Sequence, residues 1–166
     1  MKKIAPYSIL LLMFILSGFQ SDAVFNSTYR PIFMLRSDME SNVKLKGPES
    51  IIDAGKIYIK DHLIFINEKY RGIHVIDNSN PEDPTNIAFI NIDGCIDMAV
   101  KDDILYADNA VDLIAIRFDP EVTSIEVTER IRDVFPELIS PEGRGLYWKE
   151  EQAKPEGAIL VKWIKR

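Results

Sequence analysis

The chain has 166 residues and a formal charge of −6 at pH 7, with 46% apolar and 28% charged residues. This balance is typical of a globular protein and excludes an intrinsically disordered chain. The negative charge disfavours binding to nucleic acid or to an anionic membrane surface, because both attract basic protein surfaces. We therefore expect no nucleic-acid partner.

Residues 1–23 have the pattern of a secretory signal peptide. Lys2 and Lys3 precede an apolar stretch over residues 9–16, which small residues follow. A positive flank before a short apolar segment is typical of export signals. The stretch is also shorter than the ~20 apolar residues that a transmembrane helix needs. We expect an exported protein, in the periplasm or associated with the outer membrane or the cell surface.

Two ways of processing this segment remain open. Residues 21–23 place small side chains where a signal peptidase reads, which favours a mature chain beginning at Val24. Residues 16–18 resemble the start of a lipobox, but Phe19 stands where the lipid-bearing cysteine would be. The alternative is therefore an uncleaved anchor. The only cysteine, Cys95, cannot form an internal disulfide, and we expect it to be a small buried hydrophobic residue.

The N-terminal flanking segment, residues 24–54, has mixed character. Residues 32–35 predict a short strand, residues 37–40 a capped turn of helix, and Gly47-Pro48 a break. With the rest of the chain it makes one ordinary domain, long enough to bury a core. Since residues 1–23 carry two lysines and one aspartate, residues 24–166 are one unit more negative than the whole chain.

The middle of the chain contains two similar segments. The apolar pattern of residues 57–67 recurs in residues 98–108, a spacing of 41 residues. A period near 40, rich in β-branched and aromatic residues, is typical of propeller blades rather than of helical repeats. Each segment shows four strand-like runs at period two, so we expect repeat 1 over residues 55–93 and repeat 2 over residues 94–131. We predict an all-β fold of two consecutive, four-stranded, propeller-like blades with irregular flanks.

The C-terminal segment, residues 132–166, does not continue the repeat. Several proline and glycine residues interrupt it, and it closes on an apolar strand over residues 159–164. Its aromatic residues Tyr147 and Trp148, with Trp163, offer either a sugar-stacking surface or core packing, of which core packing is the commoner role.

A short motif closes the third strand of each repeat. In repeat 1 it is Ile73-His74-Val75-Ile76-Asp77, followed by Asn80-Pro81 and Asp83-Pro84. In repeat 2 it is residues 113–117, followed by Asp119-Pro120. The chain thus resembles the LVIVD-repeat proteins, a family of exported, often lipid-anchored, propeller-like proteins common in Bacteroidetes. The resemblance implies an architecture and a place in the cell envelope, but no reaction.

The chain departs from that family in two ways. Arg117 replaces the motif aspartate, so we expect the turn cap of that aspartate to be absent from repeat 2. Only two repeats are visible, where the family usually has several, and repeat units generally need about three copies to bury their faces. Three outcomes remain open: the strands at 32–35 and 159–164 cover the blades, the uncovered faces associate with another copy or a partner, or the chain is part of a longer repeat protein.

Polar loop residues supply the candidate ligand contacts. Loops on a rigid frame commonly carry binding residues, which directs attention to residues 67–72, 77–84 and 108–112. The predicted ligand-binding side chains are Asp77, Asn78, Asn80, Asp83, Asp108 and Asp112. With Glu82, the first four gather oxygen ligands of the kind calcium prefers. The loop lacks the glycine and distal glutamate of an EF-hand, however, and such residues also simply form turns, so we predict no metal and no cofactor.

No set of residues predicts a catalytic site. His62 and His74 lack any zinc-ligand spacing, and we expect both on the surface. Asp103 and Asp108 could act as acid and base in glycoside cleavage, but they occupy positions typical of repeat turns. We therefore expect a non-enzymatic binding or scaffold module of the bacterial cell envelope, with a protein or glycan partner or with self-association through uncovered blade faces. The alternative is a carbohydrate-active enzyme or a glycan-binding accessory subunit.

Overall fold

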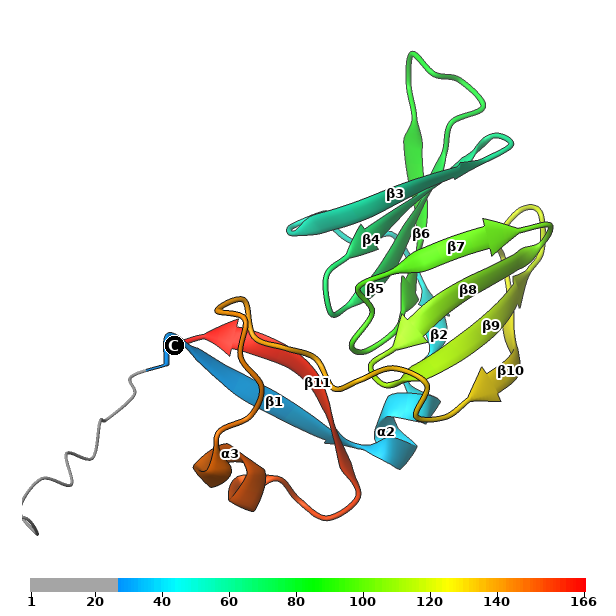
Figure 1. The fold of residues 1–166 in the computed structure, drawn as a ribbon. Helices are drawn as coiled ribbons and strands as arrows, with labels where there is room; N and C mark the ends of the chain where they lie inside the picture. Colours follow the sequence, from blue (N-terminus) through cyan, green and yellow to red (C-terminus); the bar gives the residue numbers. More distant parts are fainter. Residues whose placement is uncertain (1–26) are drawn as a thin grey trace, which may run out of the picture.

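The fold was analysed in a computed structural model, which describes residues 27–166. The predicted signal peptide, residues 1–23, lies outside the described residues. Three antiparallel sheets and two short helices form the described part of the chain, so the predicted all-β class is confirmed (Figure 1). Between residues 27 and 166, neither helix has the length and apolarity needed to cross a bilayer.

The elements follow one another along the chain with short connections. In order they are β1 (Tyr29–Leu35), α2 (Arg36–Ser41), β2 (Lys44–Lys46), β3 (Ala54–Lys60), β4 (Leu63–Glu68), β5 (Gly72–Asp77), β6 (Thr85–Asn91), β7 (Met98–Lys101), β8 (Ile104–Asn109), β9 (Asp112–Phe118), β10 (Ile125–Ile131), α3 (Trp148–Ala153) and β11 (Ala158–Lys165).

Two meanders form the centre of the molecule. The first meander is β3–β4–β5–β6, to whose outer edge β2 adds a fifth strand, and the second meander is β7–β8–β9–β10. Their pairing agrees at the 41-residue spacing, since Ile59 pairs with Ile64 and Val100 with Leu105. The first turn of each meander contains an aspartate, Asp61 or Asp102, at a φ of 53°, a conformation that aspartate tolerates.

Each meander has two apolar faces, because its side chains alternate between the two sides of the sheet. Cross-strand pairing assigns the side chains to these faces, which we name front and back. The front face of the first meander carries Leu63, Phe65, Ile73 and Val75, and its back face carries Ile57, Ile59, Ile64 and Ile66. The front face of the second meander carries Ile104, Tyr106, Leu113 and Ala115, and its back face carries Met98, Val100, Leu105, Ala107, Ile114 and Ile116.

The two meanders pack front to back. The front face of the first and the back face of the second form one buried cluster, the main core of the described chain. Phe65 and Phe118 meet across it, with ring centroids 5.4 Å apart. This packing leaves the back face of the first meander and the front face of the second without a neighbouring meander. The identification of the meanders as propeller blades of the LVIVD type stays a prediction.

The strands near the two chain ends pair with each other. β1 and β11 form a two-stranded antiparallel sheet, the terminal sheet, which lies beside the meanders in Figure 1. One of its faces packs with Met39 of α2 and Ala110 of the second meander. The other packs with Tyr70 of the first meander and Leu138. The two strands that we considered as covers of the blade faces thus pair with each other in a sheet of their own.

His74 is the second correction to the sequence analysis. We expected it on the surface, but it is fully buried on the back of the first meander, where its ring packs 4.8 Å from that of Phe89. Its Nε2 atom lies 3.1 Å from Oε2 of Glu68, which is itself buried. A buried polar group needs such a partner, and Glu68 provides it. His62, in contrast, lies exposed in the β3–β4 turn as expected.

Candidate functional site

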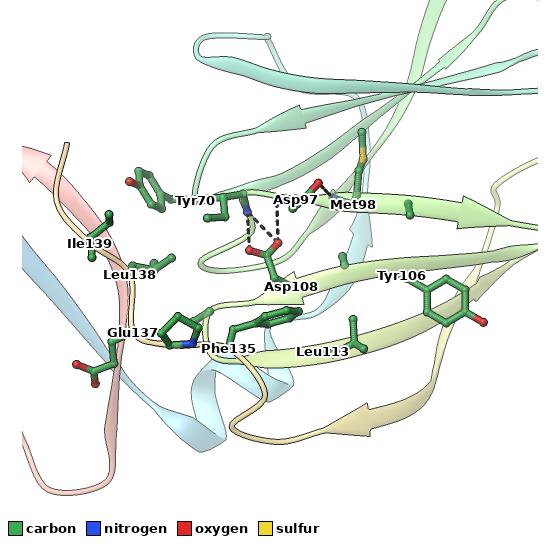
Figure 2. Close-up of a pocket in the computed structure, with 15 residues that line it drawn as sticks. Tyr70, Asp97, Met98, Tyr106, Asp108, Leu113, Phe135, Glu137, Leu138 and Ile139 are labelled. Carbon is green, nitrogen blue, oxygen red and sulfur yellow. Dashed lines mark hydrogen bonds between the residues drawn. The ribbon is translucent and has the colours of Figure 1, made fainter. Parts of the chain in front are cut away.

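A pocket of about 540 Å³ opens over the front face of the second meander. Its floor consists of side chains from three neighbouring strands, Ala99 of β7, Tyr106 of β8 and Leu113 of β9. Its opposite wall is the segment that leaves β10 and runs toward the terminal sheet (Figures 1 and 2). We call this cavity the front pocket.

The wall of the front pocket is also apolar. Phe135, Leu138 and Ile139 line it, and Tyr70 closes the end beside the first meander. Two hydrogen bonds hold the wall in place. The N–H of Phe135 donates to the carbonyl of Val111 at 2.9 Å, and the indole N–H of Trp163 donates to the carbonyl of Leu138 at 3.0 Å. The wall therefore stands on both the second meander and the terminal sheet.

Asp108 is one of three acidic residues that line the front pocket, with Asp97 and Glu137. Its carboxylate accepts the N–H groups of Ile96 and Asp97, at 2.9 and 2.8 Å (Figure 2). Burial raises the pKa of Asp108 above its ordinary value, although these hydrogen bonds favour the charged form. The carboxylate thus fixes the segment that enters β7.

Glu68 plays the matching part in the first meander. It accepts the N–H groups of Ile52 and Asp53 at 2.9 and 2.7 Å, on the segment that enters β3. Burial raises the pKa of Glu68, but these bonds and the contact with His74 outweigh it and hold the pKa below its ordinary value. In both meanders a buried carboxylate therefore positions the entry of the first strand.

A second hollow, of about 260 Å³, lies on the same face. It shares Tyr106 and Leu113 with the front pocket and extends to Ile104, Ala115 and Ile131. The two hollows make the middle of the front face an apolar surface, with Thr128 and Glu129 also lining the second hollow. Such a surface can bind an apolar segment of a partner, since binding sites are mostly apolar with a few placed polar groups.

The predicted ligand residues fall into two groups at opposite ends of the strands. Asp77, Asn78, Asn80 and Asp83 lie in or beside the β5–β6 loop, whereas Asp108 and Asp112 lie beside the β8–β9 turn. A six-residue strand such as β5 is ~20 Å long, so the two groups do not form one site. Only Asp108 lines the front pocket. The ligand-binding role of all six stays a prediction.

The β5–β6 loop is held by its own side chains. Asp77 accepts the N–H and the hydroxyl of Ser79, at 2.8 and 2.6 Å, and these bonds lower its pKa. Asn80 accepts the N–H of Glu82 at 3.3 Å. The N–H groups of Asn78 and Asp83 donate to backbone carbonyls. This is the turn-forming use of such residues.

Repeat 2 has a turn cap of its own, from a different aspartate than the motif one. Asp119, two residues after Arg117, accepts the N–H groups of Thr123 and Ser124 and the hydroxyls of both. The N–H of Thr123 and the hydroxyl of Ser124 lower the pKa of Asp119 to about 2. The turn of repeat 2 is therefore capped by Asp119, two residues after the motif position that Arg117 occupies.

Asp112 is fully buried and has several intramolecular partners. Its carboxylate accepts a guanidinium N–H of Arg36 at 2.8 Å and one of Arg130 at 2.9 Å. The N–H of Asp133 donates to it at 3.1 Å. Burial alone would raise the pKa of Asp112, but Arg36, Asp133 and Arg130 outweigh it and lower the pKa. A ligand at Asp112 would have to displace two arginines.

The carboxylates considered for glycoside cleavage lie far apart. Asp103 precedes β8 and Asp108 lies near its end, so the two are ~16 Å apart at a rise of ~3.3 Å per residue. Acid–base pairs of glycosidases lie about 5–9.5 Å apart. Trp163 is buried and unavailable for sugar stacking, while Trp148 is 66% exposed. Within residues 27–166, no three His, Cys, Asp or Glu side chains gather in a way that could hold a metal ion.

Comparison of the chain with protein-family models, with curated proteins and with solved structures found no match. The resemblance to the LVIVD-repeat proteins therefore remains a proposal, carried by the motif residues alone.

The residues that line the front pocket were not predicted as a site. Tyr106 and Leu113 lie on strands with the alternation of ordinary core residues, and Phe135 and Leu138 lie in a segment without any regular pattern. One signal could have identified Tyr106 and Leu113. They correspond to the core residues Phe65 and Ile73 of the first meander, but the repeat does not continue after residue 131 to cover them.

Proposed function

We propose that this protein is a non-enzymatic binding or scaffold module of the bacterial cell envelope, and that it holds its partner on the front face of the second meander. The predicted export signal supports the envelope as its location. The identity of the module as an LVIVD-type repeat is part of the same proposal and rests on the motif residues.

One observation carries the proposal. Phe65 and Val75 on the front face of the first meander are fully buried in the core. Their counterparts in cross-strand pairing, Tyr106 and Ala115, lie on the uncovered front face of the second meander, where Tyr106 is 38% exposed. An apolar surface that is left exposed to solvent commonly marks an interaction site.

The proposal predicts saturable binding of an apolar probe at the front pocket. We expect 8-anilinonaphthalene-1-sulfonate, titrated into the ¹⁵N-labelled protein, to shift the amide resonances of Tyr106, Leu113 and Phe135. Leu113→Glu places a charge in the pocket and should weaken binding at least tenfold. Trp148→Glu, on an exposed position of α3, should leave binding unchanged.

Two results would count against this site. Binding that shifts resonances only outside the front face would place the interaction elsewhere. Equal binding by Leu113→Glu and the unsubstituted protein would show that the front pocket takes no part.

A further inference from the structure

We propose that copies of this chain assemble head to tail, with the front face of the second meander of one copy packed on the back face of the first meander of the next. This inference rests on the proposed function, because it names the partner of the same face. The repeat provides the argument, since the chain already contains one example of the interface.

The interface within the chain shows which surfaces fit together. The front face of the first meander packs on the back face of the second, and both are buried in the main core. Positions 41 residues apart are equivalent in the first two strands of the meanders, and positions 40 apart in the third. The open front face of the second meander therefore corresponds to a surface that already binds a back face. The back face of the first meander, exposed at Ile57 and Ile59 but covered at His74, likewise corresponds to a surface that already binds a front face.

Exposure at equivalent positions supports this reading. Ile57 and Ile59 of β3 are 62% and 65% exposed on the back of the first meander. Their equivalents Met98 and Val100 of β7 are 8% and 4% exposed, because the first meander covers them. A second copy would cover Ile57 and Ile59 in the same way.

The segment that enters each meander repeats the pattern. Ile92, before β7, is fully buried against the front face of the first meander. Ile51, 41 residues earlier and before β3, is 45% exposed. In the head-to-tail arrangement, Ile51 of the next copy would reach the front pocket. The partner therefore carries its own apolar side chain for that cavity.

Charges at the interface also match. Lys56 of β3 forms an ion pair with Asp97 at 2.5 Å, across the two meanders, and these residues are 41 apart. Asp97 is the equivalent of Lys56 in the second meander. At the interface between copies, Asp97 of one copy would therefore face Lys56 of the next. The pair is therefore again of opposite charge.

The charges at the first turns follow the same rule. Lys60 forms an ion pair with Asp61 of its own turn, and Asp102 and Asp103 on the first turn of the second meander also favour its charged form. Lys101 is the equivalent of Lys60, and Asp61 that of Asp102. Between copies, Lys101 would thus face Asp61 of the next copy. This complementarity favours a second copy over an unrelated apolar partner.

Such an interface is heterologous, since its two surfaces differ. Heterologous contacts produce a closed ring where the rotation closes and an open filament where it does not. Propellers contain about four to eight blades, so a ring built from two meanders per chain would contain about two to four copies.

Sedimentation velocity on the full chain tests the proposal. We expect the unsubstituted protein to form oligomers in the micromolar range. Ile59→Glu, which blocks only the back face, and Tyr106→Glu, which blocks only the front face, should each abolish oligomers. An equimolar mixture of the two variants retains one good front and one good back face, and should form a one-to-one dimer. Trp148→Glu serves as the control and should assemble normally.

The outcomes separate this inference from the proposed function. Monomers of the unsubstituted protein at all concentrations, oligomers that neither variant disrupts, or a mixture that stays monomeric would each overturn head-to-tail assembly. If the apolar probe still binds the front pocket in that case, the binding surface survives and only its partner is wrong. If the probe does not bind either, both proposals fail.

Discussion

At the scale of single residues, buried carboxylates hold the parts of this protein together. Asp112 accepts hydrogen bonds from three parts of the chain. Arg36 follows β1, Arg130 lies in β10, and Asp133 begins the segment that leads to the front pocket. Removing one partner of a buried charge network leaves the other charges unpaired and costs much more than losing a surface ion pair.

We therefore expect Asp112→Asn to lower the free energy of unfolding by about 3 kcal/mol at pH 7. The pKa of Asp112 lies lower in the folded than in the unfolded chain. The stabilisation is thus complete above the unfolded value of about 3.9 and disappears as the pH falls through the folded pKa. Urea unfolding at a series of pH values should show the variant and the unsubstituted protein converging below pH ~4.

Asp83→Asn is the matched control, because Asp83 is exposed in the β5–β6 loop. It should change the unfolding free energy by less than ~0.5 kcal/mol. A loss at Asp112 that is equally small, or that does not diminish in acid, would contradict the role given to this carboxylate.

At the scale of elements, the turn between β4 and β5 depends on a glycine. Gly72 has a φ of +145° and pairs with Asn91 of β6. A Cβ atom at this position would lie 2.0 Å from the carbonyl oxygen of Ile90. Only glycine adopts this conformation readily, and the contact is with backbone, which cannot simply turn away. This turn also places Tyr70 at the end of the front pocket.

We expect Gly72→Ala to destabilise the protein by at least about 2 kcal/mol, from backbone strain and from the clash with β6. Thermal unfolding followed by circular dichroism measures the loss. Gly47→Ala is the control, since no atom lies within 4 Å of the added Cβ there. Equal melting temperatures for the two variants would show that the turn tolerates a side chain.

At the scale of the whole molecule, the sequence predicts the meanders well. The period-two alternation and the 41-residue spacing predict four strands in each of residues 55–93 and 94–131, and the structure has four in each, because both signals are local or regular. The pairing of β1 with β11 was not predictable in this way. It joins residues such as Tyr29 and Lys165, and neither strand's periodicity identifies its partner.

The candidate site could be predicted only in part. Sequence reasoning expected an uncovered blade face, but it could not say which face. Alternation gives Tyr106 and Phe65 the same apolar character, and only the stacking of the meanders decides which of them is buried. The burial of His74 was missed because its partner Glu68 comes from a neighbouring strand.

The central claim is that equivalent positions form core in one meander and an open binding surface in the other. Urea unfolding of Phe65→Glu and Tyr106→Glu, at a protein concentration that keeps the chain monomeric, tests it most directly. Phe65→Glu should cost at least about 3 kcal/mol, because it removes a buried ring and buries a charge, while Tyr106→Glu should cost less than ~1 kcal/mol. Equal losses for the two variants would contradict the claim, since Tyr106 would then belong to the core.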